Sequence, residues 1–251
     1  MKKTRELSGL STNQEKIMSI LEYKKIELIS RKELIDLIKK HIKIKDIVDL
    51  IEKLQKKKKL VSIKRGTYMI VPFTSVNKKW AIEDYKIADY FLKENYYLGL
   101  YNAFNLHGFT EQIPNKLFVF NTKYSFDKKI LHYNFKFFKI KKNKLFGILK
   151  KYKYPYSDKE RTIIDALDYP EYLGELSDVI KRIKNVKYDD AKLVDYSIKY
   201  NSIKIIKLVG LLTENIKLFN LLKKKKALDY YTTIKKTGTK LLDKKWKIRL
   251  I

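Results

Sequence analysis

The stretch from residue 30 to residue 72 reads SRKELIDLIKKHIKIKDIVDLIEKLQKKKKLVSIKRGTYMIVP, and its pattern decides the fold expected for the N-terminal part of the chain. Ser30 and Glu33 have the S-x-x-E spacing of a capping box, which marks the start of a helix. A second helix is indicated by apolar residues that recur at helical spacing and form one stripe: Ile44, Ile47, Val48, Ile51 and Leu54. The stretch therefore predicts two helices joined by a short turn.

Two β-rich runs, residues 60–63 and 67–71, follow the second helix, and Arg65-Gly66 between them suits a tight turn. A capping box at residues 11–14 predicts a further helix before the two already described. Three helices followed by a hairpin are typical of the winged helix-turn-helix, whose second paired helix enters the major groove of DNA. We expect this domain over residues 1–75 and a second domain over residues 76–251.

The second domain is expected to combine strands with helices. An apolar run at 117–120, an alternating run at 131–137 and an apolar run at 145–149 predict a small antiparallel sheet. A short linker is expected at 73–79. Helical spacing predicts helices near residues 80–92, 97–106 and 157–167 and in several pieces from 176 to 228, with a terminal strand at 247–251. The fold class is therefore expected to be α+β, with a helical C-terminal part.

The composition favours a polyanionic partner. The formal net charge is +29, from 57 Lys and Arg residues against 28 Asp and Glu residues. The bias toward Lys, Ile, Asn and Tyr would also result from an AT-rich genome. Part of the positive charge is therefore explained either by genome composition or by selection for a polyanionic ligand.

Cysteine is absent, no apolar run approaches the ~20 residues of a membrane-spanning helix, and no signal-peptide pattern follows the first residues. These features lead us to expect a cytoplasmic protein with no membrane association.

Cations gather where a winged helix would meet DNA. Lys43 and Lys45 are expected at the start of the recognition helix, and Lys64 and Arg65 at the tip of the hairpin, where each can meet a phosphate. The residues predicted to contact DNA are Arg31, Lys32, Lys43, Lys45, Asp46, Lys64, Arg65 and Thr67. Carboxylates on the same helix, at Asp46, Asp49 and Glu52, would repel phosphate. A protein-binding module therefore stays open as an alternative.

Three segments together resemble the AbiEi antitoxin family, the regulator half of type IV abortive-infection toxin–antitoxin pairs. They are LVSIKRGTY at 60–68, YLGLYNAFNLHGFTEQIP at 97–114 and SDKERTIIDALDYPEYLG at 157–174. The resemblance runs from about residue 13 to residue 185 and fades toward the C-terminus. It implies a transcriptional autorepressor that binds inverted repeats in its own promoter. It also implies an antitoxin that counters a nucleotidyltransferase toxin without a stable complex, and a regulator that is monomeric in solution or cooperative on DNA.

The two longer segments contain the candidate residues for antitoxicity: Glu111, Gln112, Arg161 and Asp165. A structural interpretation competes with this one. In it, Glu160 caps its helix, and Arg161 pairs with Asp165 four residues later or with Glu111 across the fold. We favour the structural interpretation for these residues.

No active site is predicted, so we expect a protein that is not an enzyme and needs no cofactor or metal. Phosphate-binding glycine loops are absent, and so is the Gly-Ser dipeptide with spaced acids expected of a nucleotidyltransferase toxin. A nuclease would need a carboxylate at position 121, directly after the predicted strand, where this chain has Asn121. The three histidines, His41, His107 and His132, are far apart in the sequence, so they do not form the cluster of ligands that a metal site needs.

Two alternative functions remain open. One is an autonomous regulator without a toxin, and the other is an RNA-binding or interaction protein that stacks bases on its tyrosines.

Overall fold

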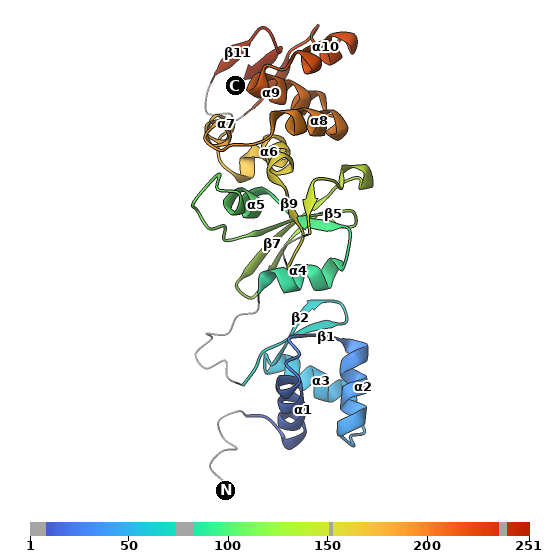
Figure 1. Cartoon of the computed structure of the whole chain (residues 1–251). Helices are drawn as coiled ribbons and strands as arrows, with labels where there is room; N and C mark the ends of the chain where they lie inside the picture. The colour runs from blue at the N-terminus through green and yellow to red at the C-terminus, as the bar shows by residue number, and fades with distance from the viewer. Residues whose placement is uncertain (1–8, 74–82, 151–152, 236–239) are drawn as a thin grey trace. The chain divides into compact units, whose positions relative to one another are not determined.

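The computed structural model describes residues 9–73, 83–150, 153–235 and 240–251, and it is a mixed α+β structure (Figure 1). The chain divides into two compact units, residues 1–90 and 91–251. The expected linker at 73–79 and the expected helix start near Trp80 lie outside the described residues, apart from Phe73 itself. Helix α4 (Asp84–Leu92) crosses the boundary between the two units.

The first unit begins with helices whose starts the sequence encodes locally. Its elements are α1 (Thr12–Tyr23), β1 (Leu28–Ser30), α2 (Arg31–His41), α3 (Ile47–Lys56), β2 (Leu60–Lys64) and β3 (Thr67–Ile70). Both predicted capping boxes are confirmed: Ser11 pairs with Gln14 at α1, and Ser30 pairs with Glu33 at α2. The hairpin of β2 and β3 is confirmed as well, and β1 adds a third antiparallel strand in the order β1-β3-β2.

Helix α3 differs from its prediction at its start and in its buried face. It begins at Ile47 with Asp46 as its N-cap, so Lys43 and Lys45 precede the helix instead of opening it. Leu50 is 3% exposed and belongs to the core, whereas Val48 is 45% exposed. The predicted stripe was therefore wrong in including Val48, because the face that packs with α1 and α2 in the core consists of residues 50, 51 and 54.

The second unit is built on one six-stranded sheet in the order β6-β7-β5-β4-β9-β8. The strands are β4 (Tyr96–Leu98), β5 (Leu117–Asn121), β6 (Phe126–Ile130), β7 (Tyr133–Lys139), β8 (Ile148–Leu149) and β9 (Tyr156–Ser157). The pairs β5–β7 and β4–β9 are parallel and the other pairs are antiparallel. The prediction of a small antiparallel sheet is thus wrong, because the sheet is mixed and larger.

The segment expected to be one helix over 97–106 is a strand followed by a helix. Tyr97 lies in β4, and α5 (Leu100–Leu106) begins only after Gly99. A side chain at Gly99 would place its Cβ 2.8 Å from the ring of Phe120 on β5, so the close approach of β4 to β5 requires glycine there.

Helices cover the remainder of the second unit. They are α6 (Lys159–Asp168), η3 (Pro170–Tyr172), α7 (Leu176–Lys184), α8 (Asp190–Tyr200), α9 (Ile203–Thr213) and α10 (Ile216–Lys224). The expected terminal strand is confirmed as β12 (Ile248–Leu250), which lies between β10 (Thr232–Ile234) and β11 (Leu241–Asp243). One hydrophobic core joins the large sheet, these helices and the fully buried Trp246. None of the helices in the described parts of the chain is long and apolar enough to cross a membrane.

Candidate nucleic-acid interface and a buried arginine network

Four of the predicted DNA-contacting residues are brought together at the start of α2. The backbone N–H of Arg31 donates a hydrogen bond to the carbonyl of Gly66, at 2.8 Å, which ties the helix start to the hairpin turn. Gly66 has a φ of 71°, a conformation that favours glycine, so the tight turn depends on this residue. Arg65 and Lys32 are exposed, and Lys64 is partly exposed. Together, Arg31, Lys32, Lys64 and Arg65 form what we call the wing group.

Lys43 and Lys45 form a second group in the connection between α2 and α3, where both are exposed. Among the described residues, neither has a carboxylate within ion-pair distance. The 11 residues of α2 separate this group from the wing group, which corresponds to about 16 Å of helix at about 1.5 Å per residue. The structure therefore places the predicted cations in two groups, one at each end of α2.

Two of the three carboxylates that argued against DNA binding, Asp46 and Asp49, are engaged within the unit. Asp46 accepts a hydrogen bond from the backbone N–H of Asp49, at 2.9 Å, and thereby caps α3. The carboxylate of Asp49 pairs with Lys53 Nζ at 2.7 Å. These contacts reduce the repulsion that Asp46 and Asp49 would exert on phosphate. They also give Asp46 a structural role that its prediction as a base contact did not include.

Thr67 was predicted to contact DNA, but in the structure its side chain is buried. It lies in β3 and is 4% exposed. Its side chain has little area to offer to DNA, so the prediction for Thr67 needs correction. The burial of Thr67 was not predictable from local patterns, because Thr67 is adjacent to the exposed turn and the pairing of β1 with β3 was not predicted.

Two of the four candidate antitoxicity residues are also buried. Arg161 and Asp165 lie on α6, both are 0% exposed, and Arg161 Nη2 is 2.9 Å from Asp165 Oδ1. The predicted pairing four residues apart is thus confirmed, and Asp165 is the partner of Arg161 within the fold. The assignment of Arg161 and Asp165 to a functional surface is wrong, because neither side chain reaches solvent.

The buried guanidinium is held from several parts of the second unit. Arg161 Nη2 donates to Tyr97 Oη at 2.6 Å, and Nη1 donates to the carbonyl of Lys144 at 2.9 Å. Tyr97 Oη also donates to Asp165 Oδ2 at 3.0 Å. The rings of Phe146, Tyr200 and Tyr97 lie 4.9, 5.0 and 5.3 Å from the guanidinium carbon. Burial raises the pKa of Asp165 to about 6, although the adjacent Arg161 opposes that change.

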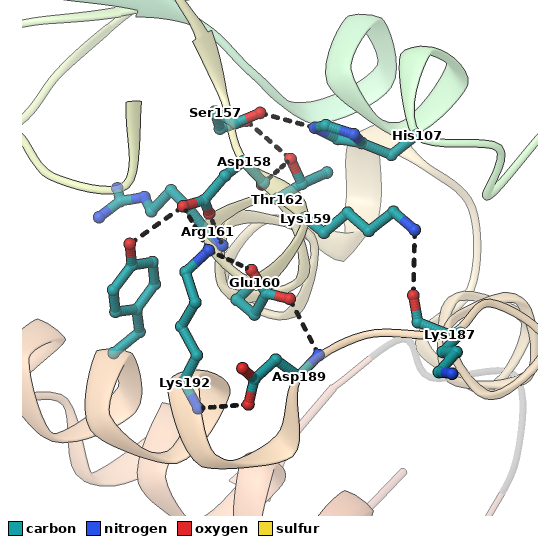
Figure 2. A network of polar contacts seen from close by, with 11 residues as sticks. His107, Ser157, Asp158, Lys159, Glu160, Arg161, Thr162, Lys187, Asp189 and Lys192 are labelled. Atoms are coloured by element: carbon teal, nitrogen blue, oxygen red, sulfur yellow. Dashed lines mark hydrogen bonds and ion pairs between the residues drawn. The ribbon is translucent and has the colours of Figure 1, made fainter. Parts of the chain in front are cut away.

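The start of α6 joins it to α8, as Figure 2 shows. The N-cap is Asp158, whose Oδ1 accepts from the N–H of Arg161 at 2.9 Å. Glu160 instead accepts from the N–H of Asp189 at 3.0 Å and pairs with Lys192 at 2.7 Å. The prediction that Glu160 caps its own helix is therefore wrong, because its carboxylate binds the start of α8.

His107 joins the end of α5 to β9. Its Nε2 is 2.7 Å from the carbonyl oxygen of Ser157, so this nitrogen carries the hydrogen and donates it (Figure 2). Burial lowers the pKa of His107, although the bond to Ser157 opposes the change. The carbonyl that the ring meets belongs to the distant strand β9 and not to the end of α5, which His107 directly follows. Among the described residues, no three His, Cys, Asp or Glu side chains are placed to hold a metal ion.

His107 leads to a prediction about the pH dependence of stability. Because burial lowers its pKa in the folded state, the unfolded chain binds a proton first as the pH falls past about 6.5. The contribution of His107 is therefore complete above that pH and lost below it. Urea unfolding at about pH 7.5 and about pH 5.5 should show a smaller loss for His107→Gln than for the wild type. The exposed His132 supplies the control, since His132→Gln should lose as much stability as the wild type does; equal losses for all three proteins would contradict the prediction.

Comparisons with known proteins find a similar fold among the solved structures. No family model matches the chain, and no curated protein matches its sequence. The structure is similar to the crystal structure of the Rv2827c protein from Mycobacterium tuberculosis, with a TM-score of 0.69 and 12% sequence identity. The match covers 96% of this chain and 92% of the mycobacterial chain. At this identity the likeness shows a shared fold and says nothing of a shared function.

Proposed function

We propose that this protein is a DNA-binding repressor that acts as the antitoxin of a type IV toxin–antitoxin pair. Its first unit would be the winged helix-turn-helix domain, with α2 and α3 as the helix pair and the turn between β2 and β3 as the wing. The three segments that resemble the AbiEi family support the antitoxin assignment. The partner would be a nucleotidyltransferase toxin that is countered without a stable complex.

The observation that carries the DNA-binding proposal is the placement of the cations at both ends of α2. The wing group and the pair Lys43 and Lys45 are separated by about 16 Å along the helix, a spacing similar to the ~12 Å width of the major groove. Cations spaced in this way can meet phosphates on both sides of a groove. Helix α3 begins directly after Lys45 and Asp46, so it would enter the groove between the two rows of phosphates.

The exposed face of α3 then supplies candidates for reading bases. Val48 is 45% exposed there, and an apolar side chain of this size suits contact with the methyl group of thymine. The sequence placed Val48 in the core stripe and therefore missed it as a possible base contact. Most cations of the chain are lysines, which bind phosphate as point charges, so specificity would come partly from the shape of the DNA.

A gel-shift titration tests the proposal. The full chain is titrated against its own upstream region and against a scrambled duplex of equal length, over a series of salt concentrations. If about six phosphates are contacted, the logarithm of affinity should fall with the logarithm of salt with a slope of about −5. Affinity for the upstream region should exceed that for the scrambled duplex at every salt concentration.

Two outcomes would count against the proposal. A flat salt response would remove DNA binding, and equal binding to both duplexes would mean that the net charge acts alone. Co-expression with a neighbouring nucleotidyltransferase gene tests the antitoxin half separately. Growth rescue by the full chain supports it, whereas selective DNA binding without rescue would identify an autonomous regulator.

A further inference from the structure

A hollow in the second unit lies between segments that are far apart in the sequence. Its volume is about 540 Å³, within the usual range of small-molecule sites. Residues from α5, from the connection before β5, from β5 and from η3 line it, among them Tyr101, Gln112, Asn115, Lys116, Phe118 and Tyr172. We call this the β5 hollow. It contains residues from both of the longer segments that resemble the antitoxin family.

Aromatic rings form one part of the β5 hollow. Tyr172 is partly exposed, and its ring packs edge-on against Phe118 and Phe138, with centroids 5.6 and 5.3 Å apart. These contacts fix the plane of the Tyr172 ring. Tyr101, also partly exposed, lies in the same wall. A tyrosine ring held in one orientation at the edge of a hollow is the kind of platform on which a nucleobase stacks.

Two lysines supply positive charge beside the rings. Lys116 Nζ and Lys136 Nζ lie 3.4 and 2.7 Å from the carboxylate of Asp127. One carboxylate therefore serves two ammonium groups, which leaves a net charge of +1 at this place. Lys136 Nζ is also 5.8 Å from the centre of the Tyr172 ring, so the charge and the stacking surface are adjacent. An anionic group on a ligand would meet this charge while its flat part covers the ring.

Two side-chain amides are the third kind of group around the β5 hollow, beside the aromatic rings and the lysines. Gln112 and Asn115 are exposed and line the hollow, and each offers both a donor and an acceptor. Gln112 Oε1 is already in contact with the hydroxyl of Tyr101, which holds this amide at the wall. Groups that donate and accept side by side match the edges of nucleobases, which also present both.

We propose that the β5 hollow binds a nucleotide. The base would stack on Tyr172, the amides of Gln112 and Asn115 would meet the base edge, and Lys116 and Lys136 would hold the phosphate. The same chemistry is presented by a free nucleotide and by the terminal nucleotide of an RNA strand. All of these residues belong to the second unit, so the site goes beyond the DNA-binding function proposed for the first.

Calorimetric titration of the full chain tests this site. The probes are uridine and adenosine monophosphates, the uncharged nucleosides uridine and adenosine, a short single-stranded RNA and inorganic phosphate. The nucleotides should bind, and inorganic phosphate should bind more weakly because it cannot stack. Tyr172→Leu should weaken nucleotide binding by about tenfold or more, as expected for a lost aromatic platform. Lys116→Gln should weaken binding of the monophosphates but not of the uncharged nucleosides.

The chain offers matched controls for both changes. Tyr124 is an exposed tyrosine of the same unit, at 43% exposure, in the connection between β5 and β6 and outside the lining of the hollow, so Tyr124→Leu should leave nucleotide affinity unchanged. Lys217 pairs with an exposed aspartate, as Lys116 does, so Lys217→Gln is the control for the loss of one charge. If Tyr172→Leu fails to fold, Gln112→Ala at the exposed rim is the replacement, and it should also weaken binding.

The titrations distinguish three outcomes: binding of an RNA strand end, binding of a free nucleotide, and no specific nucleotide binding. Tighter binding of the RNA than of the monophosphates, lost in the same variants, would identify a strand end as the ligand; the reverse order would identify a free nucleotide. Absence of nucleotide binding, or equal affinity for inorganic phosphate, would overturn the proposal. The same holds if the controls lose as much affinity as the site variants. Substitutions in the wing group should not change the titrations with monophosphates, because those probes are bound by the second unit. A failure of the DNA-binding proposal would therefore not affect the interpretation of the monophosphate result.

Discussion

Replacing Asp165 with alanine should lower the free energy of unfolding by about 3–5 kcal/mol, the usual cost of removing one partner from a buried ion pair. Asp165 and Arg161 are both 0% exposed, so the guanidinium left behind would remain charged without reaching water. Tyr97 would also lose the acceptor for its hydroxyl. Urea unfolding monitored by circular dichroism measures the change, because the pair lies in the core of the second unit.

The control is an aspartate that also forms an ion pair but is exposed. Asp195 on α8 pairs with Lys217 at 2.8 Å, and both side chains are more than half exposed. Asp195→Ala should cost no more than about 1 kcal/mol, because exposed pairs contribute little. The double variant Arg161→Met with Asp165→Leu should recover part of the loss, since it removes both charges together. An Asp165→Ala loss no larger than that of Asp195→Ala would show that the buried charge is not the cause.

Local rules predicted the helices of this chain because the necessary information lies within a few residues. Ser11 with Gln14 and Ser30 with Glu33 fix two helix starts by short-range hydrogen bonds, and both starts were predicted. The start of α3 was missed because Ile44 continues the apolar spacing backward past Asp46. Asp46 caps the helix, and the cap decides where the apolar stripe begins.

The sheet of the second unit was harder to predict because its pairing is not local. Strand β7 pairs in parallel with β5, and β6 returns along its other edge. The charged residues of β6, at 127–129, obscured its alternation. Strand β4 is an apolar run of three residues directly before a helix, and periodicity alone cannot separate such a run from the helix itself. Long-range pairing therefore decided the part of the fold that the sequence patterns left open.

In the candidate sites too, the local features were predicted and the features that depend on long-range contacts were not. The spacing of Arg161 and Asp165 predicted their ion pair, but their burial depends on Tyr97, Phe146 and Tyr200, which come from distant segments. The β5 hollow was not predicted as a site, because its residues converge only when β5 and η3 come together. Exposed cations near a tight turn could be predicted directly, because charge at a turn is a local property.

Replacing Lys64 and Arg65 together with glutamine should weaken DNA binding roughly 10- to 100-fold at about 0.1 M salt, if each side chain neutralises one phosphate. Glutamine keeps part of each aliphatic stem, so packing near the turn is largely retained. The loss should be the same for the upstream region and the scrambled duplex, because phosphate contacts position the protein without reading bases. The salt slope should become shallower by about two, one for each lost contact.

A charge-matched control separates the wing from the net charge of the chain. Lys223 and Lys224 are exposed in the last turn of α10, and changing both to glutamine also removes two positive charges. If the wing group touches DNA, this control should keep nearly the wild-type affinity and slope, because charges outside the contact release no counterions. Equal weakening in both double variants would show that the total charge acts alone. Unchanged affinity in the Lys64 and Arg65 variant would place the interface on another part of the first unit, with Lys43 and Lys45 as the next pair to replace.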